Sequence, residues 1–173
     1  NPRVDAAFAL HVMADQEVGT VGYTPGITSA AMDTFMIKIK GRGGHTSTPH
    51  QCIDPLMIAN QLYTTLNLLS GREIDPRETV ALSVGKCGGG SAANVIPDTA
   101  EFQVAARTFN RDVTKHLTQR IPEITEHVVK MWRGEYDMIS FHTPSAYNDE
   151  NLCQELEPFI GCLLYTSPSP RDT

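Results

Sequence analysis

Two kinds of hydrophobic repeat alternate along the middle of this 173-residue chain, and their order is its strongest constraint on the fold. Four segments have the apolar–polar pattern of a short strand with one buried face. In two longer segments the apolar residues are three and four apart, as in an amphipathic helix. The strand segments lie near residues 34–40, 80–84, 100–106 and 138–141, and the helical segments near 56–69 and 113–131.

From about residue 31 to 142 the order is therefore strand, helix, strand, strand, helix, strand. This is the ferredoxin-like βαββαβ order, in which an antiparallel four-stranded sheet carries two helices on one face. We expect Asp54 to cap the first helix and Gly71 to end it. Asn110 or Asp112 is expected to cap the second helix. The sequence thus predicts an α+β unit inserted between segments of a different kind.

The segment from Val4 to Met13 is a short apolar run that contains His11 near its end. Such runs are typical of strands buried on both faces of a parallel sheet. His11 would then lie near the carboxyl edge of that sheet, where open α/β sheets bind their ligands. The alternative is a core histidine with a structural role. A loop rich in glycine, threonine and proline follows over residues 15–30 and predicts a domain boundary.

A glycine-rich loop, GRGGHTSTPH at residues 41–50, separates the first strand from the first helix. Its three glycines allow a tight turn and a close approach to a ligand. They precede His45, and histidine is well suited to polarise a carbonyl group or to transfer a proton near neutral pH. His45 is therefore a candidate catalytic residue. The alternative is a tight turn that carries a surface histidine.

A second glycine run, at residues 88–90, lies between the second and third strands. It lacks the Gly-Lys-Ser/Thr ending and the following helix of a phosphate-binding loop, so we interpret it as a long hairpin connection. On the next strand, Glu101, Gln103 and Arg107 share one face. RNA-recognition domains have the same order of elements but need aromatic residues on that face and a basic surface. This polar face therefore argues against RNA binding.

The amino-acid composition limits the binding partners and the cellular compartment that we expect. A net charge of -6 argues against nucleic acid and anionic membranes, and no apolar run is long enough to span a bilayer. The four cysteines are scattered, which favours a reducing compartment, the cytoplasm. They form no Cys-x-x-Cys pair, which argues against a structural zinc knuckle. The sequence begins at Asn1 without a methionine or a leader, so we expect an internal piece of a longer protein.

Four motifs, taken together and in this order, carry a family resemblance. They are FALHV at residues 8–12, GRGGHTSTPH at 41–50 with DP at 54–55, NVIPD at 94–98 and ARTFN at 106–110. With these motifs the chain resembles the aminoacylase, hippurate hydrolase and carboxypeptidase G family of two-zinc metallopeptidases. It is most similar to the N-acyl-amino-acid amidohydrolase branch of that family, over about residues 1–161.

The resemblance implies a catalytic domain that is interrupted by a smaller lid domain through which the protein dimerises. Residues 31–142 resemble the lid. Residues 1–28 resemble the end of the first segment of an α/β zinc-peptidase catalytic domain, and residues 144–161 the start of its second segment. Residues 162–173 fit no element and resemble a translated sequencing adapter, so we expect a non-native tail. The alternative is a genuine tail rich in serine and proline.

The resemblance also assigns roles to four residues. His11 matches a metal ligand, and His45 matches the lid histidine that polarises the scissile carbonyl. Asn94 and Arg107 match residues that hold the carboxylate or the oxyanion of the substrate. The chemistry agrees in kind, because an arginine fork suits a carboxylate and because histidine and amide side chains can stabilise an oxyanion.

The implied activity is cleavage of the amide bond of N-acyl amino acids, hippurate-like conjugates included, by a metal-activated water. The implied cofactor is a divalent metal, two zinc ions with manganese or cobalt as alternatives, and the implied partners are the substrate and a second copy of the chain. The other metal ligands and the general base of the family lie outside the matched motifs. Because zinc needs at least three protein ligands, we expect this chain alone to be inactive. The alternative is a self-association module without chemistry.

Overall fold

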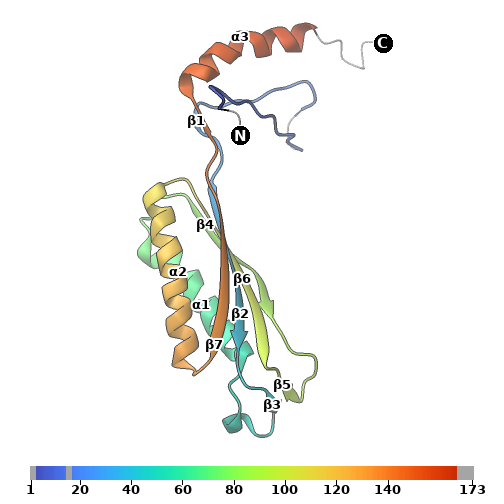
Figure 1. Ribbon diagram of the computed structural model, residues 1–173, viewed down its shortest axis with the longest axis vertical. Coiled ribbons are helices and arrows are strands. Elements are labelled where there is room, and N and C mark those ends of the chain that lie inside the picture. Colours follow the sequence, from blue (N-terminus) through green and yellow to red (C-terminus); the bar gives the residue numbers. More distant parts are fainter. Residues whose placement is uncertain (1–2, 15–16, 167–173) are drawn as a thin grey trace, which may run out of the picture. The chain divides into compact units, whose positions relative to one another are not determined.

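Figure 1 shows the computed structural model of the chain, which describes residues 3–14 and 17–166. The chain divides into two compact units. One is continuous and runs from Ile27 to Tyr147, and the other combines the described residues that precede and follow it. None of the helices in the described ranges is both long and apolar enough to cross a membrane.

The continuous unit has the element order that the hydrophobic repeats predict. Its main elements are β2 (Ala31–Lys40), α1 (Pro55–Glu73), β4 (Val80–Gly88), β6 (Thr99–Thr108), α2 (Arg111–Met131) and β7 (Glu135–Thr143). The four long strands form one sheet in the order β4-β6-β2-β7, and every neighbouring pair is antiparallel. The predicted ferredoxin-like α+β fold is confirmed.

Two further pairs of short strands accompany this sheet. One pair joins β3 (Gly44–His45) to β5 (Val95–Ile96), and the 3-10 helix η1 (Pro49–Gln51) follows β3. The other pair joins β1 (Gly26–Ile27) to β8 (Tyr147–Asn148). The β3–β5 pair connects the two glycine-rich loops.

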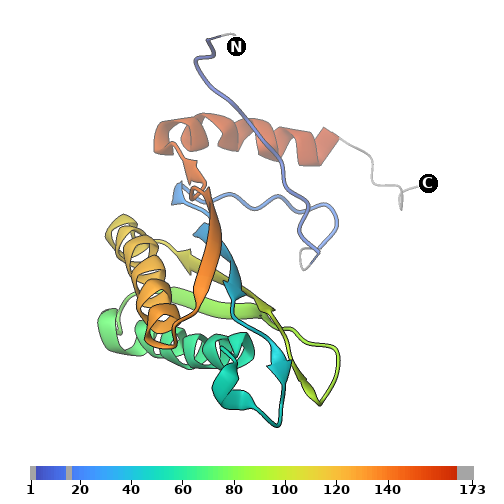
Figure 2. The ribbon, with the colours of Figure 1, turned by 60° about the horizontal axis from the view of Figure 1, so that its bottom comes forward.

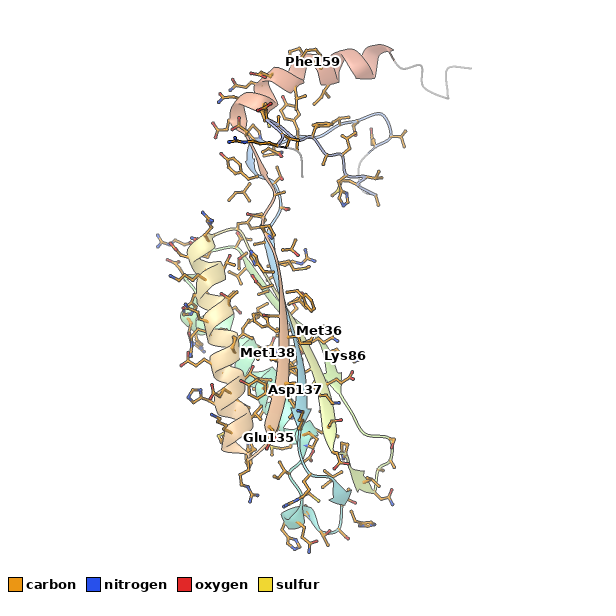
Figure 3. All side chains as sticks on the ribbon, viewed as in Figure 1. Met36, Lys86, Glu135, Asp137, Met138 and Phe159 are labelled. Carbon is orange, nitrogen blue, oxygen red and sulfur yellow. The ribbon has the colours of Figure 1, made fainter. Side chains whose placement is uncertain are left out.

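The core lies between the sheet and the two helices, which cover the same face of the sheet (Figure 2). Phe35 and Ile39 from β2 and Phe102 and Val104 from β6 are at most 2% exposed, because alternate side chains of a strand point to the same face. The helices contribute buried side chains at helical spacing, among them Ile58, Leu62, Leu66, Leu117, Ile121 and Val129. The opposite face of the sheet is open, and Met36 and Lys86 lie on it, away from α2 (Figure 3).

The helix starts were predicted correctly and one helix end was not. Asp54 Oδ1 accepts the backbone N–H groups of residues 56 and 57, and Asn110 Oδ1 accepts that of residue 112. Gly71 does not end α1, which continues to Glu73. Gly71 has no positive φ, and the last turn is held instead by Glu73, which bonds to Arg120 of α2. A contact from another helix therefore overrides the local stop signal.

The second unit differs from its prediction. The expected buried strand at Val4–Met13 does not form, and Phe8, Leu10 and Val12 are 63%, 77% and 92% exposed. A parallel strand becomes buried only when neighbouring strands bond to both of its edges, and the described residues contain no such neighbours for it. The unit also contains α3 (Glu150–Thr166), whose backbone continues through residues 162–166, where no element was expected. Residues 167–173 of the predicted tail lie outside the described ranges.

Candidate functional site

The candidate site is built from two loops at the end of the sheet where β2 finishes and β6 begins. We call residues 41–53 the histidine loop and residues 89–98 the asparagine loop. The strands β3 and β5 pair the two loops, with Gly44 opposite Ile96 and His45 opposite Val95 (Figure 1). Thr46 N–H then donates to the carbonyl of Asn94 at 3.1 Å. The pairing therefore brings two of the predicted site residues, His45 and Asn94, to neighbouring positions.

Asp98 anchors the histidine loop to the asparagine loop. Its backbone carbonyl accepts the N–H of Gly41 at 2.8 Å, and its side-chain Oδ1 accepts the N–H of Gly43 at 2.9 Å. The sequence analysis included Asp98 in a motif but gave it no role. The sequence showed an aspartate and a glycine-rich loop, but it did not show that they lie together. The β3–β5 pairing in the structure brings Asp98 to the backbone N–H groups of Gly41 and Gly43.

Close packing explains the three glycines of the histidine loop. A Cβ atom on Gly41 would lie 2.1 Å from the carbonyl oxygen of Ile53, and one on Gly43 would lie 2.5 Å from that of Ile96. A Cβ atom on Gly44 would lie 2.7 Å from Cys52 Sγ. None of the three glycines has a positive φ. Gly41 and Gly43 are therefore required by close contacts between backbones and Gly44 by the close approach of the Cys52 side chain, rather than by an unusual turn.

The histidine loop is also braced internally. Arg42 and Ile53 exchange both backbone hydrogen bonds at 2.9 Å, and Arg42 Nε donates to the carbonyl of Gln51 at 2.9 Å. Cys52, also in this loop, is buried, with its Sγ 3.7 Å from the carbonyl of Thr48. These contacts give an exposed loop a fixed backbone, as a residue that must meet a reacting group requires.

The His45 side chain is exposed at the tip of this braced loop. Its Nδ1 lies 3.2 Å from the backbone nitrogen of Ser47, which donates to it, and 2.7 Å from Ser47 Oγ. Asn94 is exposed as well. Imidazole and amide groups are both able to donate hydrogen bonds to a developing oxyanion, and here they are carried by adjoining loops.

The other two predicted residues lie elsewhere. Arg107 is exposed on the open face of the sheet, where β6 pairs it with Met32 and Ala81. It is eight positions beyond Thr99 along β6, about 26 Å at the usual rise of a strand. Arg107 is thus well separated from His45 within one chain.

His11 belongs to the second unit, in the exposed segment that was expected to form a strand. Its Nδ1 lies 2.8 Å from the carbonyl oxygen of its neighbour Val12. No group of three histidine, cysteine, aspartate or glutamate side chains lies close enough to hold a metal ion anywhere in residues 3–14 and 17–160. The described part of the chain therefore does not fit a complete metal site.

A cavity in the continuous unit is separate from the two loops. It measures about 870 Å³ and lies between β2, β7 and the first turns of α2. Asp33 is buried at its edge and lies 2.8 Å from Nδ1 of His142, while Arg111 and Lys115 line the cavity from α2. None of the four predicted site residues lines it.

The comparisons with known proteins agree with this fold. The family described as the peptidase dimerisation domain matches residues 28–132. The chain belongs to the M20 peptidase dimerisation domain family. This covers the continuous unit up to the end of α2 and includes both loops of the candidate site. The resemblance that the four motifs indicate is thereby confirmed.

Individual relatives extend the comparison. The chain is 40% identical over 151 residues to an N-acetyl-L-cysteine deacetylase of Bacillus subtilis, covering 86% of this chain and 36% of the relative. It is 38% identical over 134 residues to an N-acyl-L-amino acid amidohydrolase of Geobacillus stearothermophilus, covering 78% and 36%. A crystal structure of a dinuclear metal-binding peptidase of the M20 family from Bacillus subtilis matches with a TM-score of 0.61 and 25% identity, covering 88% of this chain and 38% of that one. The chain thus spans little more than a third of the length of these proteins.

Proposed function

We propose that this chain is the dimerisation domain, with adjoining catalytic segments, of a metal-dependent hydrolase that cleaves the amide bond of N-acyl amino acids. The observation that carries the proposal is the convergence of His45 and Asn94 on two paired loops. The names of the relatives support the substrate class, because a deacetylase of N-acetylcysteine and an N-acyl-amino-acid amidohydrolase cleave the same kind of bond. The cytoplasm remains the proposed compartment, on the grounds of cysteine usage.

In this proposal His45 and Asn94 donate hydrogen bonds to the amide oxygen as it becomes an oxyanion. Arg107 binds the carboxylate of the amino-acid part through its guanidinium fork. The distance between Arg107 and His45 within one chain far exceeds the length of a small N-acyl amino acid. We therefore propose that each active site takes His45 and Asn94 from one subunit and Arg107 from the other.

The proposed dimer forms through the lid. Among the described residues, the edge strands β4 and β7 each leave one row of backbone N–H and C=O groups without a strand partner, and a twofold-related copy can pair with such an edge. We expect light scattering to give a dimer for the full-length protein at working concentrations. A monomer throughout that range would contradict this part of the proposal.

The proposed metal centre depends on residues beyond this chain. His11 is the one candidate ligand proposed here, and zinc is the preferred metal, with manganese or cobalt as alternatives. We expect the chain alone to bind zinc weakly and to hydrolyse nothing. In the full-length protein, His11→Ala should lower the metal content measured by elemental analysis, whereas His45→Ala should leave it unchanged.

The decisive experiment is complementation between two inactive full-length variants. One carries His45→Ala, which should lower turnover by roughly two to four orders of magnitude. The other lacks the upstream general-base glutamate of the family. In a one-to-one mixture with free subunit exchange, about a quarter of the sites combine an intact base with an intact His45 from the partner and should recover activity.

The exposed His50 on the same loop provides the matched control, since His50→Ala should leave turnover close to wild type. If subunit exchange is demonstrated and no activity returns, the proposed contribution of His45 across the dimer is wrong. If the wild-type full-length protein dimerises but hydrolyses no N-acyl amino acid, the self-association module becomes the better description.

A further inference from the structure

The contact between Ser47 and His45 carries information about the protonation state of the imidazole. The backbone N–H of Ser47 donates to Nδ1 of His45, with 3.2 Å between the two nitrogen atoms. An amide N–H can only donate, so Nδ1 must present a lone pair to it. Ser47 Oγ lies 2.7 Å from the same Nδ1 and can donate as well, because a hydroxyl hydrogen rotates to suit its partner.

We infer that Ser47 is a positioning residue that sets the tautomer of neutral His45, with the proton on Nε2. His45 then offers Nε2–H as a hydrogen-bond donor at the exposed end of the ring. The assignment itself rests on the contact from the backbone N–H of Ser47 to Nδ1, and its catalytic meaning rests on the proposed function. In that function, the donor faces the amide oxygen of the substrate.

The geometry disfavours the second neutral tautomer. A proton on Nδ1 would point at the N–H of Ser47 and remove its acceptor. The contact to Ser47 Oγ would remain, because the hydroxyl can accept from Nδ1–H as well as donate to Nδ1, so the backbone N–H alone distinguishes the two tautomers. With Nδ1 facing the N–H of Ser47, the ring directs Nε2–H outward, so the exposed end of His45 acts as a hydrogen-bond donor.

The turn that contains Ser47 is itself fixed, so this contact does not depend on a mobile side chain alone. Thr48 donates to the carbonyl of His45 twice, from its backbone N–H at 3.0 Å and from Oγ1 at 3.2 Å. On the other side of the loop, Thr46 N–H donates to the carbonyl of Asn94. The backbone is held before and after Ser47, which keeps its N–H directed at the ring.

Nitrogen-15 NMR of this chain, labelled at histidine, tests the assignment without any measurement of activity. At a pH where imidazoles are neutral, we expect the Nδ1 resonance of His45 in the range of an unprotonated ring nitrogen and Nε2 in the protonated range. His50 is the internal reference, because its ring is exposed and makes no hydrogen bond within the described residues. We expect a higher ratio of Nε2–H to Nδ1–H for His45 than for His50.

Three variants of the turn sharpen this test. Ser47→Pro removes the backbone N–H that donates to Nδ1, so the tautomer ratio of His45 should fall about two- to fivefold, the effect of one modest hydrogen bond. Ser47→Ala keeps that N–H and removes only a hydroxyl that can bond to either tautomer, so the ratio should stay close to wild type. Thr48→Ala removes a hydroxyl that contacts only the backbone of His45, and the ratio should stay as in wild type. Chemical shifts of the amides in β3 and β5 report whether each variant keeps the loop intact.

Two results would overturn the inference. One is a wild-type spectrum in which Nδ1 of His45 is protonated, or in which His45 and His50 have the same tautomer ratio. The other is a Ser47→Pro spectrum unchanged at His45 while the loop amides stay in place.

A kinetic arm on the full-length protein separates this inference from the proposed function. Ser47→Pro should lower kcat about two- to fivefold with KM unchanged, because a less well oriented donor stabilises the transition state less and leaves substrate binding unchanged. An unchanged kcat alongside a shifted tautomer ratio would overturn the positioning role. A wild-type enzyme that shows the expected tautomer but hydrolyses no N-acyl amino acid would refute the proposed function and leave the assignment of the ring standing.

Discussion

The strand β2 and the segment Val4–Met13 are each ten residues long and rich in apolar side chains, yet their environments are opposite. Phe35 in β2 is 2% exposed, whereas Phe8 in the N-terminal segment is 63% exposed. β2 lies in the middle of its sheet, with β6 bonded to one edge and β7 to the other. The difference teaches that apolar content makes a buried strand only where neighbouring strands satisfy its backbone and a helix layer covers its face.

Truncation of one leucine in each unit should give the largest contrast. Leu62 on α1 is fully buried against the sheet, and Leu10 is 77% exposed. We expect Leu62→Ala to lower the free energy of unfolding by about 2–5 kcal/mol, because it leaves a cavity in a packed core. Leu10→Ala should change it by less than about 0.5 kcal/mol. Urea denaturation of both variants, followed by circular dichroism, measures the two values, and equal losses would refute the comparison.

The same contrast explains which parts of the fold were predictable. The pattern of β2, β6 and the two helices was correctly interpreted because each contributes one face to a single core, so local periodicity and tertiary burial agree. The caps at Asp54 and Asn110 were predictable because a cap bonds to its own helix. The extension of α1 past Gly71 was not, because the stabilising contact comes from Arg120, almost fifty positions away.

The candidate site follows the same rule. The local motif identified His45 as a candidate, and the resemblance added Asn94. The anchoring role of Asp98 depends on the pairing of β3 with β5. Each of these strands has only two residues, which is too short for a hydrophobic repeat to reveal it in the sequence. The placement of Arg107 far from His45 also follows from strand register, which single motifs do not specify.

Two glycines extend the comparison from side chains to the backbone. A Cβ atom on Gly43 would lie 2.5 Å from the carbonyl oxygen of Ile96, whereas one on Gly22 in the N-terminal segment would have no neighbour within 4 Å. We expect Gly43→Ala to lower the free energy of unfolding by about 1–3 kcal/mol, as overpacking does, and to separate the two loops. Gly22→Ala should be neutral or slightly stabilising. Thermal unfolding and the amide shifts of β3 and β5 give the answer, and unchanged shifts in Gly43→Ala would contradict the tight contact.

Removal of one helix cap in each unit tests whether the helices of the two units contribute equally to the free energy of unfolding. Asp54 accepts two backbone N–H groups at the start of α1, and Asp149 accepts those of Asn151 and Leu152 at the start of α3. Asp54→Ala should lower the free energy of unfolding by about 1 kcal/mol, because α1 packs on the sheet. Asp149→Ala should increase amide exchange in α3 without moving the main unfolding transition. A shift of that transition by Asp149→Ala would show that both units unfold together.

The smallest expected effect concerns the ionic contact that extends α1. The hydrogen bond from Arg120 lowers the pKa of Glu73 below its usual value of 4.5, with a further contribution from His116. Because the pKa is lowered in the folded state, the carboxylate stabilises the fold above its unfolded pKa, and this contribution disappears as the pH falls through the folded value. Glu73→Gln should therefore cost about 1 kcal/mol or less at pH 7, and the gap to wild type should close well below pH 4.5. Urea denaturation of both proteins between pH 7 and low pH measures this difference in the free energy of unfolding. A difference that stayed constant down to low pH would show that the contact stabilises the protein through packing and not through its charge.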